Sequence, residues 1–262
     1  MTTSADPRIG AAFGAARDYD GRARVQRLVA ERLAARIAAL PHPDTPRGLE
    51  LGCGTGFLTA ALQARAIGGT WLVTDLAPGM VARCRARLGA EAGHPAADLA
   101  FAVLDGERGA MPAQGPFDLI CASLAFQWFT DLPAAIARLL GWLAPGGHLM
   151  FTTLGAGTFT EWREAHAAEG LAAGTPPFPT VAALAAILPE WQAAAPLVEP
   201  EIERHADARA FLHSLKAIGA GTPGLHHRPL PPGALRRVMA RFEQAGARAT
   251  YEVVTCHYRR ET

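Results

Sequence analysis

Three closely spaced glycines constrain the fold of this chain more than any other feature. Gly52, Gly54 and Gly56 follow Glu50, which stands at the end of an apolar run. Where a strand ends in such a loop and a helix follows, the glycines let the backbone pass close to a nucleotide. A dinucleotide-binding loop needs a further glycine where this chain has Phe57. The segment therefore predicts a nucleotide site that cradles no pyrophosphate.

Two carboxylates follow at the ends of the next predicted strands. Asp75 comes after the apolar residues 71–73, and Asp105 comes directly after the apolar run 99–104. An acidic residue at the tip of the second strand can accept hydrogen bonds from both hydroxyls of a ribose. Taken alone, either aspartate could be a helix cap or a turn residue. Their order after the glycine loop favours a ligand-binding role.

The hydrophobic pattern alternates between strand and helix signals up to residue 154. Such alternation predicts the α/β class, with a parallel sheet wound on both faces. The predicted helices cover residues 24–40, 57–66, 78–88 and 132–143, and the later strands cover residues 117–123 and 148–153, the last after a turn at residues 145–147.

The alternation loosens beyond residue 154. We predict two helical insertions, over residues 157–195 and 205–246, around a short strand near residues 196–203. Residues 250–258 alternate as a final edge strand. The insertions and the N-terminal segment could cover the carboxyl edge of the sheet, so we expect ligand specificity to reside there.

The composition is that of an ordinary enzyme domain. With 262 residues, 50% of them hydrophobic, the chain can form one large α/β domain. A formal charge of +1 argues against bulk nucleic-acid binding. No apolar run reaches transmembrane length, so we expect neither membrane insertion nor secretion, and a cytoplasmic location.

The cysteines and histidines predict no metal centre and no disulfide. The adjacent His226 and His227 have no third ligand at a usable spacing. The cysteines form no C-x-x-C pair, which favours reduced, unpaired thiols. They are Cys53, Cys84, Cys121 and Cys256.

The acidic residue and its three glycines resemble motif I of the class I S-adenosylmethionine methyltransferases. This resemblance implies S-adenosylmethionine as the cofactor, with Glu50 at its methionine end, Asp75 on its ribose and Asp105 at its adenine amino group. It also implies a Rossmann-like, mostly parallel seven-stranded sheet with helical insertions over the active site. The implied cofactor-binding residues are Phe13, Tyr19, Glu50, Gly52, Gly54, Gly56, Asp75, Leu76, Met80, Asp105, Gly106, Ser123, Leu124 and Gln127.

Four further segments, residues 9–20, 123–128, 151–154 and 211–220, narrow the family. The first resembles an N-terminal lid whose tyrosine closes over the cofactor. Together they are similar to the biotin-pathway malonyl-acyl-carrier-protein O-methyltransferases, in which a Ser-Leu-Lys-x-Ile-Gly-Ala segment recurs. The resemblance implies a single methyltransferase domain over residues 1–262. Its parts are a lid (1–45), a cofactor-binding core (46–154) and substrate-side helical insertions (155–195 and 205–246).

The implied substrate needs little activation. A malonyl carboxylate is ionised at neutral pH, so it can attack a sulfonium methyl group without a base. The resemblance assigns water exclusion to Tyr19 and carboxylate binding to Lys216 with Ser214, which are the predicted catalytic residues. Lys216 could instead be an ordinary solvated helix lysine.

An acidic acyl-carrier protein would need a basic docking surface. Arg237 and Arg241 are one helical turn apart, with Arg236 adjacent and Arg228 just before the predicted helix. Ordinary solubility explains these arginines equally well. The loop over residues 105–112 departs from the family pattern, so which carboxylate meets adenine stays open.

Two other functions remain open from the sequence. A methyltransferase acting on a small carboxylate such as trans-aconitate, or a quinone C-methyltransferase, would keep the glycine loop and Asp75 without needing Lys216. A cofactor-binding regulator would bind the nucleotide without turnover.

Overall fold

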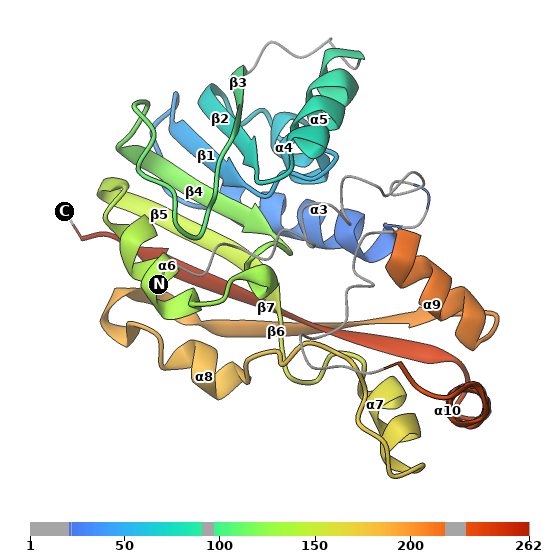
Figure 1. Cartoon of the computed structure of the whole chain (residues 1–262). Helices are drawn as coiled ribbons and strands as arrows, with labels where there is room; N and C mark the ends of the chain where they lie inside the picture. Colours follow the sequence, from blue (N-terminus) through green and yellow to red (C-terminus); the bar gives the residue numbers. More distant parts are fainter. Residues whose placement is uncertain (1–20, 22, 91–96, 218–228, 262) are drawn as a thin grey trace.

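A seven-stranded sheet forms the centre of the molecule (Figure 1). The computed structural model describes residues 21, 23–90, 97–217 and 229–261. The strand order is β3-β2-β1-β4-β5-β7-β6, in which the first five strands are parallel and β7 is antiparallel to both of its neighbours. The predicted mostly parallel sheet is therefore confirmed. Its strands are β1 (Arg47–Leu51), β2 (Gly69–Asp75), β3 (Ala97–Val103), β4 (Phe117–Ser123), β5 (Leu143–Leu154), β6 (Gln192–Arg204) and β7 (Arg248–Arg259).

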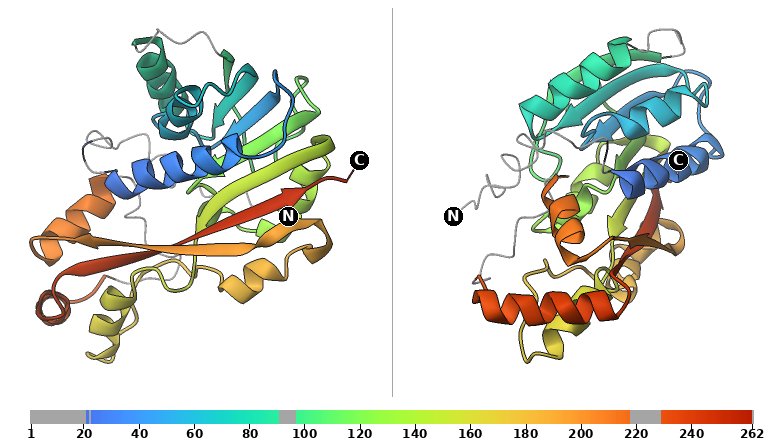
Figure 2. Two further views of the ribbon diagram at one scale, coloured as in Figure 1. Left: turned by 180° about the vertical axis from the view of Figure 1, so that it is seen from behind. Right: turned by 90° about the vertical axis from the view of Figure 1, so that its right-hand side faces the viewer.

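Helices cover both faces of the sheet (Figures 1 and 2). On one face lie α3 (Arg24–Ala38), α4 (Phe57–Gln63) and α5 (Pro78–Ala90). The other face is covered by α6 (Leu132–Leu140) and α8 (Val181–Ala185). The remaining helices are α7 (Thr160–Ala167), α9 (Ala208–Ala217) and α10 (Pro232–Gln244), with short 3₁₀ helices η1 (Phe126–Trp128) and η2 (Pro189–Trp191).

The alternation of side chains along β4 explains the two-sided core. Leu119 and Cys121 pack into the core under α3 and α4, whereas Ile120 and Ala122 pack into the core under α6. All four side chains are buried. Because both faces are covered, the strand reads in the sequence as one apolar run instead of an alternating pattern.

A third core lies around the β6–β7 ribbon, where α7, α9 and α10 gather (Figure 1). It includes Trp162, Phe211, Phe242 and Tyr251, and it also takes up Val25 from α3. The later helical segments thus have their own apolar packing and also contact the helix that precedes β1. No helix in the described ranges is long and apolar enough to span a membrane.

The prediction that residues 250–258 form an edge strand is wrong. β7 lies between β5 and β6, since Thr255 is paired with Thr152 on one side and with Leu197 on the other. The edge is β6, which also extends well beyond the predicted residues 196–203. Alternating burial tells which side chains face the core, but it does not tell how many strands lie beside the strand.

Several predicted boundaries shift in the structure. The helix predicted over residues 57–66 ends at Gln63, before a turn in which Ala66 has a left-handed φ of 55°. The helix predicted over residues 132–143 ends at Leu140, because Leu143 already pairs with Phe117 in the sheet. The turn predicted at residues 145–147 consequently lies inside β5.

Candidate functional site

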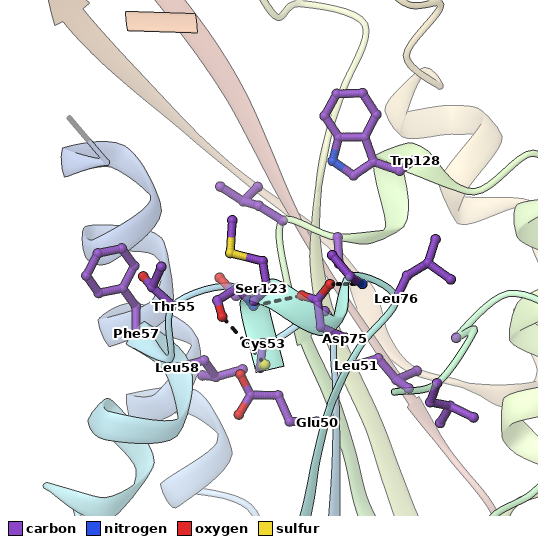
Figure 3. Close-up of a pocket in the computed structure, with 18 of the residues that line it drawn as sticks. Glu50, Leu51, Cys53, Thr55, Phe57, Leu58, Asp75, Leu76, Ser123 and Trp128 are labelled. Atoms are coloured by element: carbon purple, nitrogen blue, oxygen red, sulfur yellow. Dashed lines mark hydrogen bonds between the residues drawn. The ribbon is translucent and has the colours of Figure 1, made fainter. Parts of the chain in front are cut away.

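The loops after β1, β2, β3 and β4 surround a pocket at the carboxyl edge of the sheet (Figure 3). Gln26 and Ala30 of α3 complete its wall. Parallel strands bring their carboxyl ends to one edge, which is why loops distant in sequence meet here. The sequence-predicted residues that line it are Glu50, Gly52, Gly54, Asp75, Leu76, Met80, Asp105, Gly106, Ser123 and Leu124.

The glycine loop is shaped by what lies against it. Gly52 has a φ of 70°, and a Cβ atom there would come 2.5 Å from Cβ of Ala125 in the loop after β4. Any larger residue at position 52 would therefore push the two loops apart. Gly56 has a φ of 93° and precedes α4, but it does not line the pocket. Its role is to let the chain turn into the helix.

Asp75 is fixed at the tip of β2 by backbone hydrogen bonds. Its Oδ2 accepts from the N–H of Gly54 at 2.9 Å, and its Oδ1 accepts from the N–H of Ala77 at 2.8 Å. Burial raises the pKa of Asp75, while these N–H groups act to lower it. Each carboxylate oxygen can accept a second hydrogen bond. Asp75 is thus held in the pocket wall (Figure 3) and can still receive ligand hydroxyls.

Glu50 is a buried carboxyl group at the end of β1, only 1% exposed. Its Oε2 accepts a hydrogen bond from Oγ1 of Thr59 at 2.5 Å. Burial raises its pKa to about 7; the Thr59 bond acts to lower it, and the nearby Asp75 carboxylate to raise it. A cation entering the pocket would favour the ionised form. Glu50 is therefore suited to recognise a ligand ammonium group.

The loop after β3 is held by its own carboxylates. Oδ1 of Asp105 accepts from the N–H groups of Glu107 and Arg108, at 2.9 and 3.0 Å. Oε1 of Glu107 accepts from the N–H groups of Thr130 and Asp131, both at 2.8 Å. Because Glu107 is bound to the loop that follows η1, we favour Asp105 as the carboxylate that meets a ligand base.

Arg138 of α6 ties this loop to the helix beneath it. Its guanidinium donates to the carbonyl oxygens of Gly109 and Gly106, at 2.5 and 2.6 Å. It also stacks on the ring of Trp142, 4.7 Å from the centroid. One planar group thus fixes two carbonyl oxygens of the same loop. The position of Gly106 in the pocket wall depends on α6.

The apolar part of the wall was missed by sequence reasoning. Leu104, Trp128 and Phe129 line the pocket beside Asp105. The Phe129 ring lies close to Gly106, since a Cβ atom on that glycine would meet it at 3.3 Å. Two aromatic residues directly after a strand-end segment were the available signal, because flat rings are common beside nucleotide bases. Further lining residues are Leu51, Cys53, Thr55, Phe57, Leu58, Ala77, Glu107 and Ala125.

Several predicted residues do not line the pocket. The Gln127 side chain donates from Nε2 to the carbonyl oxygen of Leu124 at 2.5 Å. The Ser214 hydroxyl is buried and donates to the carbonyl oxygen of Phe211 at 2.8 Å, within α9. Lys216, near the end of α9, is exposed. The predicted Phe13 and Tyr19, like Arg228, His226 and His227, lie outside the described residues.

Three of the predicted docking arginines, Arg236, Arg237 and Arg241, are exposed on α10. Arg237 and Arg241 both donate to the carboxylate of Glu169, just after α7, and these bonds lower the pKa of Glu169. Part of the positive charge of this surface is therefore balanced within the protein.

The four cysteines are free and buried. Over the described residues, no cluster of three His, Cys, Asp or Glu side chains is placed to hold a metal ion.

Comparison with solved structures supports the fold. The YcgJ protein of Bacillus subtilis has a TM-score of 0.58 and 13% identity, over 89% of this chain and 98% of that one. Phosphoethanolamine N-methyltransferase 2 of Haemonchus contortus, solved with S-adenosyl-L-methionine, has a TM-score of 0.54 and 15% identity, over 97% of this chain and 57% of that one. At such identities the likeness concerns the fold alone.

Comparison of sequences is more specific. A family model described as a methyltransferase domain matches residues 49–149. The biotin biosynthesis bifunctional protein BioCD of Bordetella avium is 43% identical over 97% of this chain, which spans about half (53%) of that relative. Malonyl-[acyl-carrier protein] O-methyltransferase of Magnetococcus marinus is 40% identical over 97% of this chain and 92% of its own length. The chain therefore belongs to the malonyl-[acyl-carrier protein] O-methyltransferase family.

Proposed function

We propose that the protein methylates the free carboxylate of malonyl-acyl-carrier protein, with S-adenosylmethionine as methyl donor, in an early step of biotin synthesis. The observation that carries this proposal is the pair of fixed carboxylates, Glu50 and Asp75, in the pocket of a chain that is 40% identical to a relative of that name. When bound, S-adenosylmethionine supplies a methyl group on a positively charged sulfur.

The pocket chemistry fits this cofactor at three points. The ring walls of Trp128 and Phe129 suit its adenine, and Asp75 suits its ribose hydroxyls. Glu50 suits its amino acid end, because a buried carboxyl group with a pKa of about 7 gains its charge when an ammonium group arrives. We propose these roles from the chemistry of the side chains.

The substrate requires no base from the protein. The malonyl carboxylate carries its own negative charge at neutral pH, and one of its oxygens forms the new C–O bond while the methyl–sulfur bond breaks. The electron pair of that bond stays on sulfur, so no proton is transferred. The protein has to orient the carboxylate and exclude water, because a carboxylate that keeps its hydration shell is a weaker nucleophile.

We propose that the helical insertions and the N-terminal segment recognise the substrate. We propose Lys216 as the cation that meets the malonyl carboxylate, since its exposed side chain is available to a ligand arriving from solvent. Ser214 would have to leave its bond to Phe211 to contact the same group, so we give it a supporting role. Tyr19 is proposed as a lid residue.

Complementation and substrate competition test the proposal. The gene should restore growth of a biotin-requiring strain that lacks this methyltransferase activity, and failure of a well-expressed protein to do so would contradict the pathway assignment. In vitro, excess trans-aconitate or a quinone should not reduce methylation of malonyl-acyl-carrier protein. Strong competition by either one would favour the corresponding small-molecule alternative. Cofactor binding without turnover on any of these substrates would favour a regulator.

A further inference from the structure

Leu124 has a backbone conformation that its side chain disfavours. It follows β4 directly and has a φ of 49°, in the left-handed region. A bulky residue there is an outlier, and such strain persists only where surrounding groups hold it. Leu124, Ser123 and Ala125 all line the pocket. The strained residue is therefore at the centre of the pocket segment that β4 provides.

Two side chains hold the peptide groups of Leu124. Its N–H donates to both the carbonyl oxygen and Oγ1 of Thr152 on β5, at 3.1 and 3.0 Å. Its carbonyl oxygen accepts from Nε2 of Gln127 at 2.5 Å. Thr152 is buried, and so is Oε1 of Gln127, which finds no hydrogen-bond partner among the described residues. Within the described part of the chain, the Gln127 side chain thus makes its one hydrogen bond to Leu124.

The left-handed turn at Leu124 lets two neighbouring side chains, those of Leu124 and Ala125, pack against different parts of the protein. The partly buried side chain of Leu124 packs against the third core. On the pocket side, Ala125 fills the space left by Gly52, whose added Cβ would come within 2.5 Å of it. Loss of the left-handed backbone conformation at Leu124 would therefore displace Ala125 against the glycine loop.

We propose that Gln127 and Thr152 are positioning residues that hold Leu124 in its left-handed conformation and thereby keep Ser123 and Ala125 in the pocket wall. Gln127 acts through the backbone of Leu124 and need not touch a ligand. The expected effect of these residues on turnover rests on the proposed function. Their effect on the backbone conformation of Leu124 is independent of that function.

The chain contains a matched control for this arrangement. Leu188 also has a left-handed φ, 44°, and directly precedes the 3₁₀ helix η2, whereas Ala125 stands between Leu124 and η1. Gln192 donates from Nε2 to the carbonyl oxygens of Leu184, Ala185 and Ile187 nearby. Neither Leu188 nor Gln192 lines the pocket. Loss of this second glutamine should disturb its own turn without affecting a ligand.

The experiment combines removal of the holding group with relief of the strain. Gln127→Leu removes the donor, and Leu124→Asn supplies a residue that tolerates the left-handed region. Amide hydrogen exchange in the ligand-free protein reports on residues 123–129, and calorimetry with S-adenosylhomocysteine reports on the pocket. We expect Gln127→Leu to speed exchange of this segment and to weaken binding about tenfold. The double variant should recover exchange protection and bind within about threefold of the wild type.

The outcomes separate the two proposals. Gln127→Leu with unchanged exchange and affinity would overturn the positioning role. An impaired Gln127→Leu that Leu124→Asn does not rescue would also overturn it, because Gln127 would then act by another route. Gln192→Leu should leave affinity unchanged. If Gln127→Leu does not fold, Gln127→Met, which also lacks the donor, replaces it. Should the wild type fail to bind S-adenosylhomocysteine, the cofactor proposal fails, while hydrogen exchange still decides the positioning role.

Discussion

At the residue scale, Glu50 makes stability depend on pH. Burial raises its pKa from 4.5 to about 7. Within this window the folded protein keeps a proton that the unfolded chain has released, so stability falls as pH rises and the loss is complete above the folded pKa. Glu50→Gln removes this titration. We expect its stability relative to wild type to be about 3 kcal/mol more favourable at pH 8 than at pH 4.

Chemical unfolding at the two pH values measures this difference. Glu31→Gln, which changes an exposed carboxylate on α3, is the control. If Glu50→Gln behaves like Glu31→Gln, the Glu50 carboxyl group does not titrate near neutrality.

Asp75 gives the second prediction at this scale. Because its two oxygens are fixed by Gly54 and Ala77, the carboxylate needs no reorganisation to accept ribose hydroxyls. We expect Asp75→Ala to weaken S-adenosylmethionine binding by about 1.5–3 kcal/mol, the range for hydrogen bonds to a charged group. Calorimetry on the folded variant is the measurement. Asp118→Ala is the control, because Asp118 also accepts a backbone hydrogen bond, from Arg47, but does not line the pocket. Equal affinities for the two variants would remove Asp75 from the site.

At the scale of elements, α6 positions the loop after β3 through Arg138. Arg138→Ala leaves the carbonyls of Gly106 and Gly109 without their donor. We expect stability to fall by about 1.5–3 kcal/mol and cofactor affinity to fall several-fold. Arg138→Lys should recover little, because an ammonium group cannot reproduce the planar fork.

Arg260 offers a matched control for this element. It donates to the carbonyl oxygen of Leu143 at 2.6 Å, at a place that does not line the pocket. Arg260→Ala should therefore reduce stability while leaving cofactor affinity unchanged. If Arg138→Ala also leaves affinity unchanged, α6 does not control the pocket.

At the scale of the whole molecule, the proposed carrier-protein dock can be tested by charge. Arg237→Glu should raise the KM for malonyl-acyl-carrier protein about tenfold at low ionic strength, because it reverses a charge on the exposed face of α10. The effect should weaken with salt and be absent for malonyl-coenzyme A. Since Arg237 also pairs with Glu169, the melting temperature is measured in parallel. Arg65→Glu, an exposed change just beyond α4, is the control. An unchanged KM places the dock elsewhere.

The first half of the molecule was largely predictable from sequence. Glu50 and Asp75 stand at the carboxyl ends of two predicted strands. Because parallel pairing brings such ends to one edge of the sheet, the local sequence pattern was sufficient to predict a pocket at that edge. The position of β7 was not predictable, because alternation does not specify a strand's neighbours. The direction of the Gln127 side chain was not predictable either, because it depends on the left-handed turn at Leu124. A sequence motif shows which residue type stands at a position. The hydrogen-bond partner of that side chain depends on how the surrounding backbone folds.

The most direct measurement is methyl transfer itself. Purified protein is incubated with S-adenosylmethionine and malonyl-acyl-carrier protein, and the carrier protein is examined by intact mass spectrometry. We predict that the mass increases by one methyl group in place of a proton and that Asp75→Ala greatly slows this increase. A wild-type protein that binds the cofactor but leaves the mass of malonyl-acyl-carrier protein unchanged would contradict the proposed function.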